Sequence, residues 1–355
     1  MEKRATRQIT LGTVKIGGGA PVSVQSMTKT YTADVEATVA EIDRLERAGC
    51  DIVRVAVPDM ESARAISHIK RRTSLPIVAD IHFDYRLALE ALEGGVDGLR
   101  INPGNIGSRE RIRAVVRAAA ERRVPIRVGV NSGSLEKDIL RRHGSPTAEA
   151  LVESALRHVA ILEDLGFGEI KISVKSTSVP TMIEAYRMLA HRVDYPLHLG
   201  VTESGTPGSG TIKSAVGIGT LLAEGIGDTI RVSLTGDPVE EVYVGLEILR
   251  GLGLRDGGVE IISCPGCGRL EIDLVRLVRE VEERIKGLEV SKPLKVAILG
   301  CVVNGPGEAT EADIGIAGGR GKGVLYRHGR LVKSFPEKEL VDVLVREIEK
   351  EAGGG

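Results

Sequence analysis

The sequence lacks several features that mark common classes of protein. Its 48 Lys and Arg residues are balanced by 49 Asp and Glu residues, so no charge excess attracts nucleic acid or an anionic membrane. No run of about 18 apolar residues could span a bilayer, and the first ten residues lack the apolar run of a signal peptide. We therefore expect a cytoplasmic protein with neither a nucleic-acid nor a membrane partner.

Cysteine is also scarce, with four residues in the chain. Cys264 and Cys267 form the motif CPGCG, Cys301 lies near the start of GCVVNGPGEA, and Cys50 stands alone. In a reducing compartment a few clustered cysteines are more often metal ligands or catalysts than a disulfide framework. The CxxxCxxC run of radical-generating enzymes is absent.

Short β-branched runs alternate with segments of helical periodicity eight times before residue 255. The predicted strands cover 22–28, 51–58, 76–83, 96–103, 125–133, 169–177, 196–205 and 229–236. Eight such units over about 250 residues match an α/β TIM (β/α)8 barrel, and a hairpin over 10–19 could close its bottom. An open doubly wound sheet is the alternative, but it would more often carry a Gly-rich dinucleotide motif after its first strand, which is missing here.

The predicted strand ends are unusually polar, and active sites of TIM barrels lie at these ends. The polar residues there are Arg54, Asp80, His82, Arg100, Asn102, Arg127, Asn131, Lys171, Ser173, Lys175, Glu203, Arg231, Ser233 and Thr235. Internal ion pairing is one interpretation, but the two acids cannot neutralise four Arg and one or two Lys. The excess favours a site for a multiply charged anion, most simply a diphosphate, with His82 as a candidate hydrogen-bond donor or acid.

The pattern changes after residues 255–258. A strand (259–263), the CPGCG turn, a helix (270–287), a second strand (294–300), the GCVVNGPGEA loop, a glycine-rich hairpin (315–323) and a final helix (337–352) follow. These elements predict a smaller α+β domain. We place the barrel at 1–256 and this second domain, which carries the clustered cysteines, at 257–355.

The second domain offers three thiols and a nearby carboxylate as metal ligands. Cys50 precedes the second strand, at the bottom of the barrel, and is expected to be an inert packed thiol. A structural zinc site would need a fourth Cys or a His, and no His lies between Cys264 and Glu308. Glu308 shares a loop with Cys301. Three thiolates and one oxygen donor favour an iron–sulfur cluster with one exchangeable position.

At these residues the chain resembles a known family. The segments CPGCGR, GCVVNGPGEA, ADIHFDYRLA, GLRINPGNIG, VGVNSGSL and GVTESG are similar to those of the 4-hydroxy-3-methylbut-2-en-1-yl diphosphate synthases, in their two-domain bacterial form. The resemblance implies reductive opening of 2-C-methyl-D-erythritol 2,4-cyclodiphosphate in isoprenoid biosynthesis, with two electrons from flavodoxin or ferredoxin. It also implies a [4Fe-4S] cluster held by Cys264, Cys267, Cys301 and Glu308.

The resemblance further implies roles for individual side chains. Arg54, Arg100, Arg127, Lys175 and Ser233 would hold the cyclic diphosphate, Asn304 would contribute from the cluster domain, and Glu203 would serve in proton transfer. The strand-end positions add His82 as a second catalytic candidate and Asn102, Asn131 and Arg231 as further substrate ligands.

The connection between the domains predicts a head-to-tail homodimer. The helix after the eighth strand returns the chain to the barrel bottom, opposite the anion site, so a cluster could more easily serve a partner's barrel. Two alternatives stay open. One is a zinc-stapled TIM-barrel lyase or pterin-type transferase acting on a phosphorylated substrate, and the other is a redox carrier without catalysis.

Overall fold

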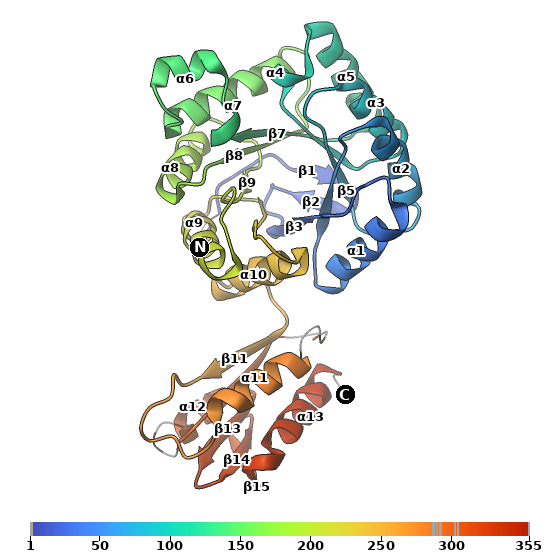
Figure 1. Ribbon diagram of the computed structural model, residues 1–355. Helices are drawn as coiled ribbons and strands as arrows, with labels where there is room; N and C mark the ends of the chain where they lie inside the picture. The colour runs from blue at the N-terminus through green and yellow to red at the C-terminus, as the bar shows by residue number, and fades with distance from the viewer. Residues whose placement is uncertain are drawn as a thin grey trace. The chain divides into compact units, whose positions relative to one another are not determined.

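The computed structural model describes residues 3–285, 288, 290, 293–301, 303 and 305–353. The chain divides into two compact units, Met1–Arg255 and Asp256–Gly355, each with its own sheet and core (Figure 1). None of the helices in the described part of the chain is long and apolar enough to cross a membrane.

Unit one is a parallel barrel. Its strands are β3 (Ser23–Met27), β4 (Ile52–Ala56), β5 (Ile77–Asp80), β6 (Gly98–Ile101), β7 (Ile126–Asn131), β8 (Ile170–Lys175), β9 (His198–Leu199) and β10 (Thr229–Ile230). They pair in the order β8-β7-β6-β5-β4-β3-β10-β9, and a parallel bridge between Ile172 and Leu197 joins the two ends. This closure confirms the TIM barrel and excludes the open doubly wound sheet.

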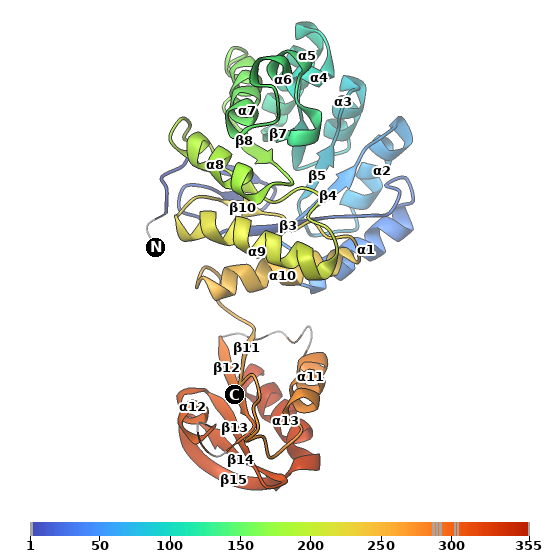
Figure 2. The ribbon, with the colours of Figure 1, turned by 60° about the vertical axis from the view of Figure 1, so that its left-hand side comes forward.

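A helix follows each barrel strand. These helices are α1 (Val35–Arg47), α2 (Met60–Lys70), α3 (Tyr85–Glu93), α5 (Arg109–Arg122), α7 (Ala148–Glu163), α8 (Val179–Ala190), α9 (Pro207–Ala223) and α10 (Pro238–Gly251), with short helices α4 (Pro103–Ile106) and α6 (Lys137–His143) as additions. Figure 2 shows α9 and α10 side by side on the outside of the barrel. Asp237 caps α10 through the Val239 N–H, and Pro238 occupies its first turn, where a missing N–H costs nothing.

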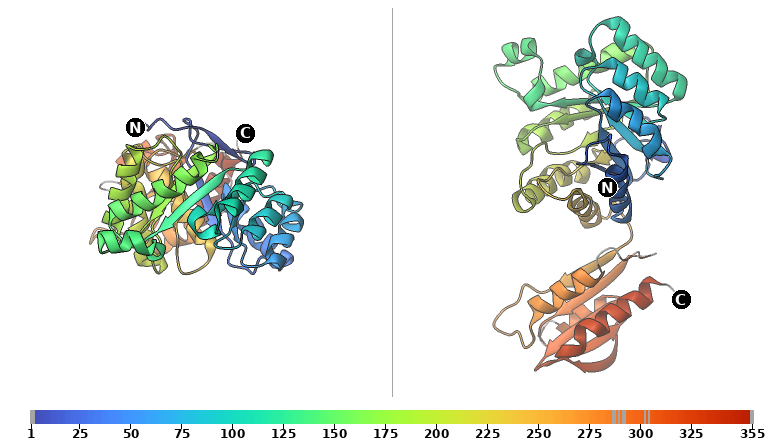
Figure 3. Two further views of the ribbon diagram at one scale, coloured as in Figure 1. Left: turned by 90° about the horizontal axis from the view of Figure 1, so that it is seen from above. Right: turned by 45° about the vertical axis from the view of Figure 1, so that its right-hand side comes forward.

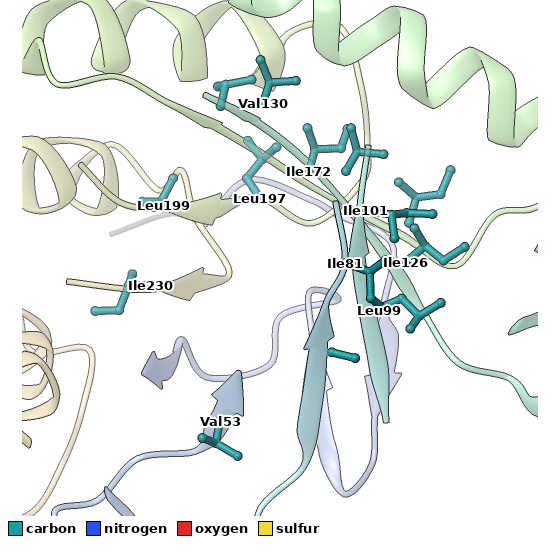
Figure 4. Packing of buried hydrophobic residues seen from close by; sticks show 14 of the residues in the cluster. Val53, Ile81, Leu99, Ile101, Ile126, Val130, Ile172, Leu197, Leu199 and Ile230 are labelled. Atoms are coloured by element: carbon teal, nitrogen blue, oxygen red, sulfur yellow. The ribbon is translucent and has the colours of Figure 1, made fainter. Parts of the chain in front are cut away.

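The hydrophobic core of unit one lies between the strands and the ring of helices. Successive side chains on a strand face opposite sides, so on β7 the buried apolar residues Ile126, Val128 and Val130 alternate with Arg127 and Asn131. Figure 4 shows core residues of this kind from several strands. The apolar half of each strand therefore packs outward, and the polar half lines the barrel interior.

The N-terminal hairpin closes the bottom of the barrel. Strands β1 (Ile9–Leu11) and β2 (Val14–Ile16) pair antiparallel, and Ile9, Leu11 and Ile16 form a small core with Ile52 and Val78. The latter two residues lie at or next to the first residues of β4 and β5. Because the hairpin covers the end where the strands begin, the opposite end, where the strands finish, is open for a site.

Unit two is an α+β domain, as predicted. Its five-stranded sheet has the order β11 (Val259–Ser263), β12 (Leu294–Leu299), β13 (Ile314–Gly319), β14 (Lys322–Arg327) and β15 (Arg330–Pro336), parallel as far as β13 and antiparallel beyond. Helices α11 (Leu274–Ile285) and α13 (Leu340–Ala352) lie side by side over this sheet (Figure 3).

Two predictions of local structure differ from the fold. Strands β9 and β10 have two residues each, whereas the sequence predicts runs of ten and eight, because the backbone beyond Leu199 and Ile230 leaves the barrel ladder to form the site. The GCVVNGPGEA segment is predicted as a loop, but its second half begins helix α12 (Gly305–Glu311). Pro306 fits the first turn of a helix, where its missing N–H needs no partner.

Candidate active site

A polar cavity opens at the carboxyl ends of the barrel strands. It has a volume of about 160 Å³ and is lined by Arg54, Asp80, His82, Arg100, Arg127, Asn131, Ser173, Lys175, Thr202, Arg231 and Ser233. Five of these side chains are cations and one, Asp80, is a carboxylate. The structure thus brings ten of the predicted strand-end residues together and adds Thr202, to which no sequence pattern pointed.

Strand register explains why the charges meet. Asp80, Arg100, Arg127 and Lys171 lie opposite one another on four neighbouring strands, β5 to β8. Asp80 Oδ1 lies 3.1 Å from Arg100 Nη1, and Asp80 Oδ2 lies 3.5 Å from Arg54 Nε. Burial opposes ionisation of Asp80, but attraction from Arg54, Arg100 and Arg127 outweighs it and lowers its pKa to about 2. Asp80 is therefore a permanent anion that neutralises only part of the cluster.

His82 is a half-exposed neighbour of this group. Arg100 Nη1 lies 3.0 Å from His82 Nε2, and a guanidinium can only donate, so the ring nitrogen accepts. Burial, followed by the charge of Arg100, lowers the pKa of His82. A neutral imidazole at pH 7 is the consequence, and it can take up a proton when an anion enters the cavity.

Two glycines make room for cations. A Cβ on Gly129 would lie 2.6 Å from Arg100 Nε, and Arg100 Nη2 donates to the Gly129 carbonyl at 2.9 Å. A Cβ on Gly200 would lie 2.6 Å from Lys175 Nζ. The absence of side chains on β7 and just beyond β9 therefore allows these long side chains to lie across the barrel interior.

The remaining cations of the cavity have few partners. Arg127 Nε and Nη1 are buried without a hydrogen bond among the described residues. Burial, followed by the charges of neighbouring Arg residues, lowers the pKa of both Arg127 and Lys175 well below the ordinary values. A bound polyanion would raise the pKa of both groups again, because it would supply the negative charge that the neighbouring side chains do not.

Polar groups continue below the cavity. Lys171 Nζ and His198 Nε2 are fully enclosed and have no partner in the described part of the chain. Burial and then Arg127 lower the pKa of Lys171 to about 7, and burial and then Arg127 lower the pKa of His198 well below its ordinary value. Lys171 belongs to the predicted strand-end group, but its side chain does not line the cavity. His198 was not among the residues predicted from the sequence.

Three other strand-end residues predicted from the sequence, Asn102, Glu203 and Thr235, lie outside the cavity lining. Asn102 is buried and its Oδ1 accepts from the Gly129 N–H at 3.1 Å, so it fixes the β7 backbone. Glu203 is exposed in the loop after β9, with a left-handed backbone φ of +49°. Such a conformation is uncommon for a residue with a side chain and concentrates at functional sites.

The cysteines of unit two lie at one edge of its sheet. Cys264 and Cys267 follow β11, Cys301 follows the neighbouring parallel strand β12, and Glu308 lies on α12. The two loops contact each other, since the Glu271 N–H donates to the Gly300 carbonyl at 3.1 Å and Leu270 packs on Gly300.

The donor set fits an iron–sulfur cluster chemically, with three thiols and a carboxylate on adjoining segments. No three Cys, His, Asp or Glu side chains in the described ranges lie close enough to hold a metal ion. Asn304 lies outside the described residues. Cys50 is separate and inert, because burial raises its thiol pKa to about 12.

The fold and the cavity define a TIM-barrel enzyme with a cationic site at its strand ends and a separate cysteine-bearing domain. Residues 6–246 match the GcpE TIM-barrel domain, and residues 260–350 match the GcpE protein C-terminal domain. The chain belongs to the GcpE family. The resemblance drawn from its motifs is thereby confirmed.

Curated relatives support the same assignment along almost the whole chain. The protein from Geobacter sulfurreducens is 61% identical and covers 98% of both chains, and that from Clostridium perfringens is 60% identical and covers 98% of this chain and 99% of its own. Each is named 4-hydroxy-3-methylbut-2-en-1-yl diphosphate synthase (flavodoxin).

Solved structures of other enzymes share only the barrel. Dihydropteroate synthase from Xanthomonas albilineans is 16% identical, with a TM-score of 0.50 over 70% of this chain and 98% of its own. 3-Dehydroquinate dehydratase from Geobacillus kaustophilus is 18% identical, with a TM-score of 0.50 over 70% of this chain and 99% of its own. This likeness shows the fold and does not favour the pterin-type alternative.

Lys171→Met should stabilise the barrel. Native Lys171, with its pKa of about 7 against an ordinary 10.5, binds its proton more weakly than in the unfolded chain. The resulting penalty is complete below pH 7 and disappears as the pH rises toward 10.5. We expect the variant to gain roughly 4 kcal/mol at pH 7 and under about 1 kcal/mol near pH 10 in urea unfolding. The exposed Lys213→Met is the control, and an equal gain at both pH values would contradict the prediction.

Proposed function

We propose that this chain makes 4-hydroxy-3-methylbut-2-en-1-yl diphosphate by reductive ring opening and dehydration of 2-C-methyl-D-erythritol 2,4-cyclodiphosphate, with two electrons from flavodoxin. The observation that carries the proposal is the cavity with five cations and one carboxylate, which favours a polyanionic ligand. The relatives, named for this product and for flavodoxin, supply the identity of the reaction and of the donor.

The barrel side chains bind and orient the substrate. Arg54, Arg100 and Arg127 come from β4, β6 and β7, and Lys175 and Arg231 reach the same cavity from β8 and from the segment after β10. Arg forks match phosphate oxygens, and Ser233 and Asn131 add neutral hydrogen-bonding groups. Because Asp80 already holds Arg54 and Arg100, these two guanidinium groups are oriented before the substrate arrives.

Glu203 is proposed as the acid that protonates the departing hydroxyl, and neutral His82 as a second group that can donate or accept at the diphosphate. Both lie in the loops that follow barrel strands, where catalytic residues of this fold are found. Glu203 has no hydrogen-bond or ion-pair partner within the described residues, so its carboxyl is available to the substrate.

A [4Fe-4S] cluster held by Cys264, Cys267, Cys301 and Glu308 would supply the two electrons one at a time. The chain's part is to present these donors from two adjoining loops and the first turn of α12, with Asn304 beside them in the sequence. Such thiols stay reduced in the cytoplasm, where we place the protein.

We further propose a head-to-tail homodimer in which each cluster domain serves the partner's barrel. Arg255, the last residue of unit one, binds Asp51 through two hydrogen bonds of 2.8 and 2.9 Å, just before β4 begins. The chain thus leaves the barrel at the end opposite the cavity. Tyr31 and Phe83 are large exposed apolar side chains in the loops around the cavity end, and such groups are typical of interfaces.

Metal analysis tests the cofactor. Anaerobically purified protein should contain about four irons and four acid-labile sulfides per chain, and Cys267→Ser should lose most of both because it removes one thiolate. Cys50→Ser, at the buried thiol far from this set in the sequence, is the control with unchanged iron. Zinc near one per chain without sulfide after anaerobic reconstitution would favour the zinc-stapled lyase or transferase.

Glu203→Gln tests the acid. It should keep cluster content and substrate affinity but lower turnover by about 10²–10⁴-fold, because the amide has the shape of the carboxyl without its proton. Steady-state assays with a chemical reductant, together with equilibrium binding of the cyclodiphosphate, separate the two effects. Turnover close to the unmodified enzyme would reject the acid role.

Subunit complementation tests the dimer. Cys267→Ser and Glu203→Gln chains, each inactive alone, should regain about one quarter of full activity when co-expressed in equal amounts, because half of the dimers are mixed and one of their two sites is intact. Mixed dimers isolated by two affinity tags and found inactive would show that each site is formed by a single chain.

A further inference from the structure

Glu241 is a buried carboxylate beside the cavity that has no place in the proposed chemistry. It lies in the first turn of α10, and its side chain is about 1% exposed. Oε1 accepts from the Leu234 N–H at 3.0 Å, and Oε2 accepts from Ser26 Oγ at 3.2 Å. Oε2 also lies 3.5 Å from Arg231 Nη2, and Oε1 lies 3.8 Å from Lys29 Nζ. One side chain therefore joins β3, the segment after β10 and helix α10.

The segment that Glu241 holds carries two of the proposed substrate ligands. Pairing between β10 and β3 ends at Ile230, so Arg231 and Ser233 lie on backbone outside the paired strand. Beyond the Arg231 N–H bond to Leu199, Glu241 accepts from the Leu234 N–H and Ser204 donates to the Ser233 carbonyl. The Thr235 N–H donates to the Gly205 carbonyl, and Lys29 donates to the carbonyls of Leu234 and Gly236. Arg231 Nε has no partner among the described residues, so the guanidinium is held mainly through its Nη2 edge.

The sign of the charge makes this arrangement informative. A carboxylate beside an anion site repels the ligand, and burying it also costs desolvation free energy. Glu241 is the second carboxylate near the cavity, after Asp80. It is unfavourable for diphosphate binding unless fixing the position of Arg231 gains more free energy than the repulsion costs. The four contacts of Glu241 fix that position.

We propose that Glu241 is a positioning residue, which aims Arg231 and the 231–236 segment at the diphosphate of the substrate. This inference rests on the proposed function. Its observable consequence is opposite to that of simple electrostatics: removal of the negative charge weakens the binding of an anion.

The test is a set of substitutions in the anaerobic holoenzyme, with affinity for the cyclodiphosphate measured by isothermal titration calorimetry. Glu241→Gln and Glu241→Asp should each weaken binding about tenfold, the first because it removes the charge that orients Arg231 and the second because it shortens the reach by one methylene. The neighbouring exposed Glu240→Gln should bind as the unmodified enzyme does. Circular dichroism and iron content establish that each variant is folded and loaded.

A double-mutant cycle with Arg231→Met identifies the route of the effect. If Glu241 acts through Arg231, Glu241→Gln adds less than about twofold to the loss already caused by Arg231→Met. Losses that simply multiply would overturn the proposal, as would tighter or unchanged binding in Glu241→Gln or unchanged binding in Glu241→Asp.

Inorganic diphosphate, titrated against the same proteins, separates this inference from the proposed function. Failure of the unmodified enzyme to bind the cyclodiphosphate contradicts the proposed function, and the order of diphosphate affinities then decides the role of Glu241. Normal cyclodiphosphate binding with no effect of Glu241 substitutions contradicts only the positioning role.

Discussion

The excess of cations over carboxylates inside the barrel is the constraint on which the rest of the site depends. Asp80 offsets part of the charge on Arg54 and Arg100, whereas Arg127 and Lys171 continue the same row of side chains without a carboxylate partner in the described part of the chain. Buried ions without counter-charges are unfavourable, so an external anion that enters the cavity would stabilise the native state. Ligand binding and charge neutralisation are then the same event.

The outer part of the barrel stabilises this unfavourable interior. Parallel strands in this fold pack one side against helices, and the large core of unit one supplies the hydrophobic stabilisation that the polar interior cannot. The hairpin core of Ile9, Leu11 and Ile16 adds closure at the bottom. Cations can therefore be concentrated at the strand ends without loss of the fold, since the residues that fold the barrel and those that line the cavity alternate along the same strands.

Much of this arrangement could be predicted from the sequence, because strands carry a two-residue period and TIM barrels place their sites at one end. The grouping of Arg54, Asp80, Arg100 and Arg127 follows from those two rules alone. Glu241 could not be found in this way. It lies in a helix beside the similar Glu240, and only the three-dimensional packing turns one of the two toward the barrel.

The two-residue strands β9 and β10 were unpredictable for a related reason. Their sequences continue to look like strands after Leu199 and Ile230, but the regular ladder ends there, and side chains such as Ser204 and Glu241 help to fix the backbone. Pairing of this kind depends on residues distant in sequence. Local pattern therefore indicates where a barrel strand begins more reliably than where it ends.

The same features that suit the site for its ligand reduce the stability of the free protein. Three features each carry a cost that packing elsewhere must offset. They are the left-handed backbone of Glu203, the enclosed amine of Lys171, and the Arg127 nitrogens that have no partner among the described residues. Lys171 is the informative case, because it contributes to this cost without lining the cavity. The charge of Lys171 adds to the positive potential in the cavity. Arg127, which lies opposite Lys171 on the neighbouring strand, lines the cavity itself. A barrel optimised for stability alone would replace Lys171 by an apolar residue, so its presence is consistent with an interior arranged to attract a polyanion.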